Sequence, residues 1–270
     1  MTTSPSTARV ADRRQRVQSA EMGLSVLKAL TRLGGAASLT ATAAEVDESP
    51  AKVHRYLASL CQQGFVEQSP VNQHYYLAQE SIAIGLAALR QCDPIRLGEA
   101  SLQRLRQALE VTAFLAVMGN KGATVLRMEE PTLPVTVNIR AGSVLSTLWS
   151  ATGRVFLGFS SDRLVIDMAE QELAEASADR RAQLDGTRPV EQLRQQVRAR
   201  GWAVAHDSLL KGISALAAPV FDATGNVCAC LTTLGATGGF DLRPDGAICP
   251  ALLQEARLIS RAMGYQGNPG

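Results

Sequence analysis

The order of secondary-structure patterns between residues 17 and 79 is the feature that most constrains the fold. Apolar residues recur at helical spacing from Val17 to Leu33, and Gly34-Gly35 ends that helix. A short helical segment, TATAAEV, follows, with Thr40 as its expected N-cap. Ser49-Pro50 then begins a third helix, because a capping hydroxyl followed by proline favours a helix start.

This third helix leads into a strand pair. It runs to Gly64, a natural C-terminal cap, and two β-prone runs, FVEQ and HYYLA, follow it through SPVNQ as a hairpin. The order of helix, short helix, turn, longer helix and hairpin is that of a winged helix-turn-helix, which inserts a helix into the major groove of DNA. We therefore expect DNA contacts from the third helix and the hairpin tip, through Ser49, Ala51, Lys52, His54, Arg55, Asn72 and Gln73.

Basic side chains in this region suit a nucleic-acid partner. The guanidinium of Arg55 can bond to guanine or clamp a phosphate, and the ammonium of Lys52 can neutralise a phosphate. The alternative interpretation is that this polar helix face contacts only solvent. Residues 1–16 carry four arginines against the single acid Asp12, so they are either a flexible basic arm on DNA or a solvated tail.

The second half of the chain has a different pattern. Residues 80–92 contain an apolar, alanine-rich helix typical of a linker, and Asp93-Pro94 breaks it. Strand patterns such as TAFLAVMG, ATVLRMEE and NVCACLTTL then alternate in blocks with helical stretches. This segregation indicates an α+β domain with a mainly antiparallel sheet.

Several classes of protein are disfavoured. No apolar run approaches the roughly 18 residues of a membrane span, and no apolar stretch follows the N-terminal arginines, so we expect a soluble, cytoplasmic protein without a membrane partner. The five cysteines favour free thiols. Cys228 and Cys230 are expected on one face of a strand, but the three histidines are scattered, so we expect no metal and no cofactor.

The adjacent pair His206-Asp207 invites a catalytic interpretation. No nucleophile lies at the spacing of a hydrolase motif, and the chain contains no G-x-S-x-G. A capped turn is the simpler interpretation, and we expect no enzyme activity.

Four stretches resemble the IclR family of bacterial transcriptional regulators: Val17-Gln18-Ser19, KVHRYLASLCQQGFV, RAGSVLSTLWSATGRVFLGF and GISALAAPVFDATGNVCACLTTLG. They occur in family order over nearly the whole chain. The resemblance implies dimers or tetramers on palindromic double-stranded operator DNA. It also implies three parts, namely a winged helix-turn-helix DNA-binding domain (17–79), a linker helix (80–92) and a GAF-like effector-binding and oligomerisation domain (93–265). The expected flexible basic arm (1–16) precedes them.

The resemblance also indicates an effector site. The family pattern Gly-Ser-x-x-Pro-x-His-x-Thr/Ser-x-x-Gly-Lys becomes GSVLSTLWSATGR, with Ser146, Leu148 and Arg154 in place of proline, histidine and lysine. Family positions that line the site correspond to Val137, Leu145, Ala151, Thr152, Ala205, Ile213, Ala215, Thr232 and Leu234. Aliphatic groups with two threonines suit a small organic acid with an aromatic body, although Val137 and Ala215 are equally compatible with plain core.

The sequence thus predicts a ligand-responsive regulator, repressor or activator, of a catabolic operon, with aromatic catabolism as the expected setting. Two alternatives stay open. One is a constitutive DNA-binding regulator whose pocket is filled by side chains such as Trp149. The other is an enzyme with a DNA-binding appendage.

Overall fold

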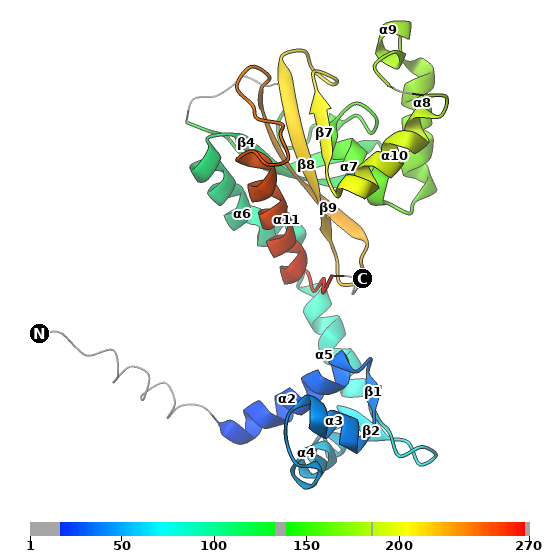
Figure 1. Cartoon of the computed structure of the whole chain (residues 1–270), viewed down its shortest axis with the longest axis vertical. Coiled ribbons are helices and arrows are strands. Elements are labelled where there is room, and N and C mark those ends of the chain that lie inside the picture. Colours follow the sequence, from blue (N-terminus) through cyan, green and yellow to red (C-terminus); the bar gives the residue numbers. More distant parts are fainter. Residues whose placement is uncertain (1–16, 133–138, 185, 268–270) are drawn as a thin grey trace, which may run out of the picture. The chain divides into compact units, whose positions relative to one another are not determined.

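The computed structural model describes residues 17–132, 139–184 and 186–267. The chain divides into two compact units, residues 1–91 and residues 92–270, whose elements are labelled in Figure 1. The expected basic arm at 1–16 and the expected pocket residue Val137 lie outside the described residues. None of the helices in the described ranges combines the length and the apolar character that a membrane crossing needs.

The first unit is three helices, a small sheet and a further helix. Its three-stranded antiparallel sheet has the order β1-β3-β2, and its core is built on Val26, Leu30, Val53, Leu57 and Tyr75. This is the expected winged helix-turn-helix, with the two-residue strand β1 as an addition that the sequence pattern did not indicate. The elements are α2 (Gln18–Arg32), β1 (Ala36–Ala37), α3 (Leu39–Glu45), α4 (Pro50–Gln62), β2 (Val66–Gln68), β3 (Tyr75–Leu77) and α5 (Gln79–Arg90).

Two helix starts differ in detail from the expectation. The N-cap of α3 is Ser38, whose hydroxyl accepts a hydrogen bond from the amide of Ala41 at 3.2 Å, so the expectation of Thr40 was wrong. Ser49 is at the N-cap of α4, but its hydroxyl makes no capping bond. Pro50 at the first turn, with its preset φ, therefore favours this start without help from a side chain.

The second unit is built on a six-stranded sheet. The strand order is β6-β5-β4-β9-β8-β7, and every neighbouring pair is antiparallel, as the block pattern of the sequence predicted. Its elements are α6 (Pro94–Leu109), β4 (Thr112–Gly119), β5 (Gly122–Glu129), β6 (Val144–Leu145), α7 (Ala151–Phe159), α8 (Arg163–Glu175), α9 (Ala178–Arg181), α10 (Pro189–Arg200), β7 (Ala203–His206), β8 (Ile213–Phe221), β9 (Val227–Ala236) and α11 (Ile248–Ala262).

Helices cover both faces of this sheet. Helices α6 and α11 pack on one face, and α7 packs on the other with α10 and α8 beyond it (Figure 1). Alternate strand residues therefore enter different cores. Phe114 and Ala116 of β4 belong to the core on the α7 side, whereas Ala113 and Leu115 belong to the core on the α6 and α11 side.

The strand β9 contains an irregularity that overturns one expectation. Val220 pairs with Ala229 and Phe221 pairs with Val227, so Cys228 is an extra residue in β9. Cys228 consequently packs against the core on the α6 and α11 side, while Cys230 lies in the core on the α7 side. The two thiols do not share a face, and within the described ranges no group of three potential ligands could hold a metal.

Candidate DNA interface and effector cavity

Helix α4 is amphipathic in a way that presents its polar face. Val53 and Leu57 are fully buried, and their burial turns Ser49, Ala51 and Arg55 toward solvent. Within the described residues the guanidinium of Arg55 forms no ion pair, so its five donors are available to a partner.

Two other residues of this face already have protein partners. The ammonium of Lys52 lies 2.5 Å from a carboxylate oxygen of Glu48, one helical turn earlier. A phosphate would have to compete with this carboxylate for Lys52. His54 is exposed, but its Nδ1 lies 3.2 Å from the hydroxyl of Tyr75, which connects α4 to β3.

The hairpin tip is held by its own side chains. Asn72 donates to the hydroxyl of Tyr76 at 2.9 Å and accepts from the amide of His74 at 3.0 Å. Gln73 adopts a left-handed φ of 58° and donates to the carbonyl of Pro70 at 3.1 Å. Asn72 and Gln73, which were expected to contact DNA, thus stabilise the tip of the hairpin. Both side chains are exposed there.

The expected effector residues of the second unit surround one small space, which we call the effector cavity. It lies on the α7 side of the sheet and has a volume of about 30 Å³. Of the expected set it brings together Leu145, Ala151, Thr152, Ala205, Ile213, Ala215, Thr232 and Leu234. Sequence reasoning missed five further lining residues: Phe114, Ile139, Ser150, Leu209 and Leu210.

The polar groups of the effector cavity satisfy one another. The hydroxyl oxygens of Thr152 and Thr232 are 2.9 Å apart, and both side chains are almost fully buried. The thiol of Cys230 is 3.6 Å from the hydroxyl of Thr232. The cavity volume of about 30 Å³ is well below the roughly 300–1,000 Å³ of pockets that hold drug-sized ligands, so an aromatic acid requires the lining to move. Trp149 does not line this space; its ring packs under the guanidinium of Arg180 at 4.9 Å.

The loop before α7 explains one of the three departures from the family pattern, Ser146. The carboxylate of Glu172 accepts from the hydroxyl of Ser146 at 2.5 Å and from the amides of Thr147 and Leu148 at 2.7 and 3.0 Å. A proline at position 146 could not donate in this way. Glu172 therefore anchors the loop that leads into the effector cavity.

Close packing fixes the same loop against α7. A Cβ at Gly153 would lie 2.2 Å from the carbonyl oxygen of Ser146, so only glycine fits there. The hydroxyl of Ser150 caps α7 by accepting from the amide of Gly153 at 2.9 Å. Thr152 is thereby held in place beside the strands.

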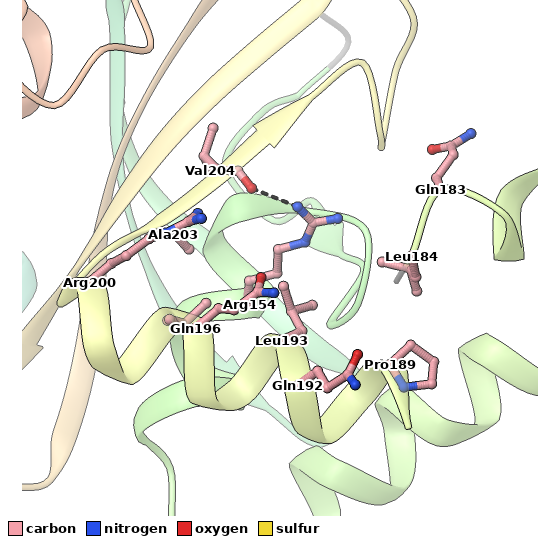
Figure 2. Close-up of a pocket in the computed structure, with 11 residues that line it drawn as sticks. Arg154, Gln183, Leu184, Pro189, Gln192, Leu193, Gln196, Arg200, Ala203 and Val204 are labelled. Carbon is pink, nitrogen blue, oxygen red and sulfur yellow. Dashed lines mark hydrogen bonds between the residues drawn. The ribbon is translucent and has the colours of Figure 1, made fainter. Parts of the chain in front are cut away.

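The third departure, Arg154, has an interior position. Its Nε donates to the carbonyl of Leu148 at 2.8 Å. Its Nη1 donates to the carbonyl of Val204 at 2.6 Å, a bond that Figure 2 shows as a dashed line. Burial lowers the pKa of Arg154 to about 10, so the guanidinium stays charged at neutral pH.

Comparison with known proteins assigns the family. The model of the IclR helix-turn-helix domain matches residues 19–70, and the model of the bacterial transcriptional regulator IclR C-terminal domain matches residues 86–261. The chain belongs to the IclR family. It is thus a DNA-binding transcriptional regulator with an effector-binding domain.

Individual relatives agree with this assignment. The IclR-family chain is similar to HmgR of Pseudomonas aeruginosa, whose crystal structure matches with 42% identity and a TM-score of 0.84 over 93% of this chain and 100% of that chain. It is 24% identical to the HTH-type transcriptional regulator BhcR of Paracoccus denitrificans, over 94% of this chain and 90% of that protein. It is also 24% identical to the transcriptional repressor IclR of Escherichia coli, over 76% of this chain and 75% of that protein.

The IclR family is a family of regulators and not of enzymes, as the sequence predicted. The pair His206-Asp207 fits this. The carboxylate of Asp207 accepts from the hydroxyl of Thr237 at 2.6 Å and from the amide of Gly212 at 2.9 Å, and these bonds lower the pKa of Asp207. The side chain therefore closes the turn between β7 and β8, as a capping residue does.

Proposed function

We propose that this IclR-family protein, acting in the cytoplasm as a dimer or tetramer, controls a catabolic operon in response to a small aromatic acid. The observation that carries this proposal is the effector cavity. Its lining is aliphatic and aromatic apart from Ser150, Thr152 and Thr232, so it offers a ring an apolar site and offers a polar end a few hydroxyls. The setting in aromatic catabolism follows from that ligand class.

An aromatic acid needs a wider cavity than the one described above. Leu209 and Leu210 line the cavity from the turn between β7 and β8, and Leu210 is partly exposed already. We expect this turn to move outward and the ring to lie among Phe114, Ile139 and Leu234. Such a ligand changes DNA affinity only if it binds one arrangement of the regulator better than the other.

The face of α4 supports the DNA contacts. We propose that Arg55 contacts a base or a phosphate and that Ser49, Ala51 and His54 line the same interface. Lys52 would bind a phosphate after leaving Glu48, and Asn72 and Gln73 would place the hairpin tip beside the backbone. The arm at 1–16 would add arginines to the same phosphates.

The exposed apolar side chains of α5 support self-association. Ile82, Ile84, Leu86 and Leu89 are about half exposed, and the helix buries no residue within the chain. We propose that a second copy covers this face, so that residues 80–92 link the DNA-binding domain at 17–79 to the effector-binding domain at 93–265. Two helix-turn-helix units would then meet the half-sites of a palindromic operator.

A DNA-binding titration tests the proposal. The purified full chain is titrated with DNA from upstream of its own gene and of the adjacent operon, alone and with benzoate, phenylacetate, pyruvate or glyoxylate. We expect an aromatic acid to change operator affinity at least about fivefold. A response to short keto acids alone would refute the aromatic class, and no response to any acid would favour the constitutive alternative.

A cavity-filling variant serves as the matched control. Ala215→Leu adds volume inside the effector cavity, whereas Ala199→Leu makes the same change on the exposed surface of α10. We expect only Ala215→Leu to abolish the response, with operator affinity in the absence of acid retained by both variants. An unchanged response in a folded Ala215→Leu protein would place the effector elsewhere.

A further inference from the structure

Arg154 is a charged, partly buried group of the second unit, and no counter-ion contacts it within the described residues. Its guanidinium is densely surrounded by protein, between α7, α10 and β7 (Figure 2). Within residues 17–132, 139–184 and 186–267 it forms no ion pair, and its two hydrogen bonds go to the neutral carbonyls of Leu148 and Val204. Carbonyl dipoles recover only part of the cost of burying a charge, and an anion would recover more.

A hollow lies in front of this guanidinium, and we call it the Arg154 hollow. Its volume is about 180 Å³, and no residue of its lining is shared with the effector cavity. Figure 2 shows the polar side chains that it receives from α10 and from the segment before it, namely Gln183, Gln192, Gln196 and Arg200. Its other walls are apolar: Leu184, Pro189, Leu193, Val197 and Ala203.

The electrostatic balance around the hollow favours an anion. Arg154 and Arg200 are its charged lining residues within the described ranges. A second, more open hollow shares Arg154, Gln183 and Val204 with it and adds His206, Asp207, Ser208 and Lys211. The carboxylate of Asp207 forms no ion pair with Arg154 within the described residues, and it accepts hydrogen bonds from Thr237 and Gly212 instead.

We propose that the Arg154 hollow is a second ligand site and that it binds a short-chain carboxylate. The planar guanidinium can offer its Nη groups to two carboxylate oxygens, and the glutamine amides can donate to the same group. The apolar walls suit a hydrocarbon chain. The volume of about 180 Å³ is below the roughly 300 Å³ at which pockets for drug-sized ligands begin, which favours a ligand of a few carbon atoms.

The site adjoins the effector cavity through two shared elements. On α7, Thr152 lines the effector cavity and Arg154 lines the hollow; on β7, Ala205 lines the effector cavity and Val204 lines the hollow. A carboxylate that draws Arg154 away from the Val204 carbonyl therefore removes a hydrogen bond from β7, the strand that borders the effector cavity. Binding at the hollow does not depend on the proposed aromatic effector.

The test uses the full chain and butanoate as the probe, with inorganic phosphate and sodium chloride at matched ionic strength as comparison anions. Binding is followed by calorimetry and by the melting temperature. The test variant Gln196→Glu places a negative charge in the lining of the Arg154 hollow. The control variant Gln195→Glu places the same charge on α10 outside that lining, and both positions are exposed. We expect saturable butanoate binding, weakened at least about tenfold by Gln196→Glu and at most about twofold by Gln195→Glu.

Two further variants identify the site. Arg154→Lys keeps a charge but loses the planar fork, and we expect it to weaken butanoate binding at least about tenfold. Ala215→Leu fills the effector cavity and should retain saturable butanoate binding. The proposal is overturned by non-saturable binding, by equal effects of the two glutamate variants, by loss of butanoate binding in Ala215→Leu, or by preference for phosphate over butanoate. If Arg154→Lys does not fold, the comparison of the glutamate variants decides.

Discussion

The hydroxyl pair of the effector cavity makes a sharp prediction about stability. Thr152 and Thr232 are 2.9 Å apart and almost fully buried, and they belong to α7 and β9, 80 residues apart in sequence. Replacing either threonine by valine keeps the shape of the side chain and removes one hydroxyl. The remaining hydroxyl is then buried without its partner, whereas the double variant removes both polar groups together.

The structure sets the order of the effects. Thr232→Val leaves the Thr152 hydroxyl without its partner and should lower the free energy of unfolding by about 2 kcal/mol. Thr152→Val should cost less, about 1 kcal/mol, because the Thr232 hydroxyl keeps the Cys230 thiol at 3.6 Å. The double variant should lie within about 1 kcal/mol of the wild type, since no unpaired hydroxyl remains in it.

Urea denaturation followed by tryptophan fluorescence measures these differences. Both tryptophans, Trp149 and Trp202, lie in the second unit, so the signal reports the unit that contains the pair. If the double variant loses as much free energy of unfolding as the two single variants together, the hydrogen bond between Thr152 and Thr232 is refuted. The same variants test ligand binding. Thr232→Val should weaken the binding of the best aromatic acid about tenfold, because one polar group of the ligand loses its hydrogen-bond partner.

Three more predictions concern other parts of the chain. Arg55→Ala should weaken operator binding by about 1–3 kcal/mol with the oligomeric state unchanged, and equal affinity in an anisotropy titration would remove Arg55 from the interface. Deletion of residues 1–16 should flatten the slope of log affinity against log salt, and an identical slope would make the arm a passive tail. The carboxylate of Glu255 accepts hydrogen bonds from Arg104 at 2.6 and 2.8 Å. Burial alone would raise the pKa of Glu255, but its hydrogen bonds and the charge of Arg104 together outweigh burial, and the pKa is lowered. Its stabilisation is therefore complete above the unfolded glutamate pKa of about 4.3 and is lost as pH falls through the lowered folded value. The stability difference between wild type and Arg104→Met should shrink across that window in acid denaturation, and a difference independent of pH would contradict the pairing.

Local patterns predicted the elements well where the cause is local. Pro50 and the apolar spacing of Val53 and Leu57 were enough to indicate α4. The cap of α3 was misplaced because Ser38 and Thr40 both offer a hydroxyl, and the choice depends on Leu39 packing into the core of the first unit. The extra residue at Cys228 depends on how β9 pairs with β8, which no single strand pattern contains.

The candidate sites divide in the same way. The family resemblance supplied eight described positions that line the effector cavity, but Phe114 was missed because β4 is apolar on both faces and shows no alternation. Arg154 was visible only as a departure from a pattern. Its acceptors Leu148 and Val204 lie 6 and 50 residues away, so its burial and its unbalanced charge follow from tertiary structure alone.

The alternation of side chains across the central strands separates two kinds of change that this regulator can tolerate. Along β9, Cys230, Thr232 and Leu234 point to the effector cavity and its surroundings, whereas Ala229 and Leu231 support α6 and α11. The same division holds in β8 between Ala215 and Leu216. Under the proposed function, substitutions at every second residue should therefore change which small molecule is recognised while the packing beneath the two outer helices stays intact, and libraries restricted to those positions should yield regulators with new effectors.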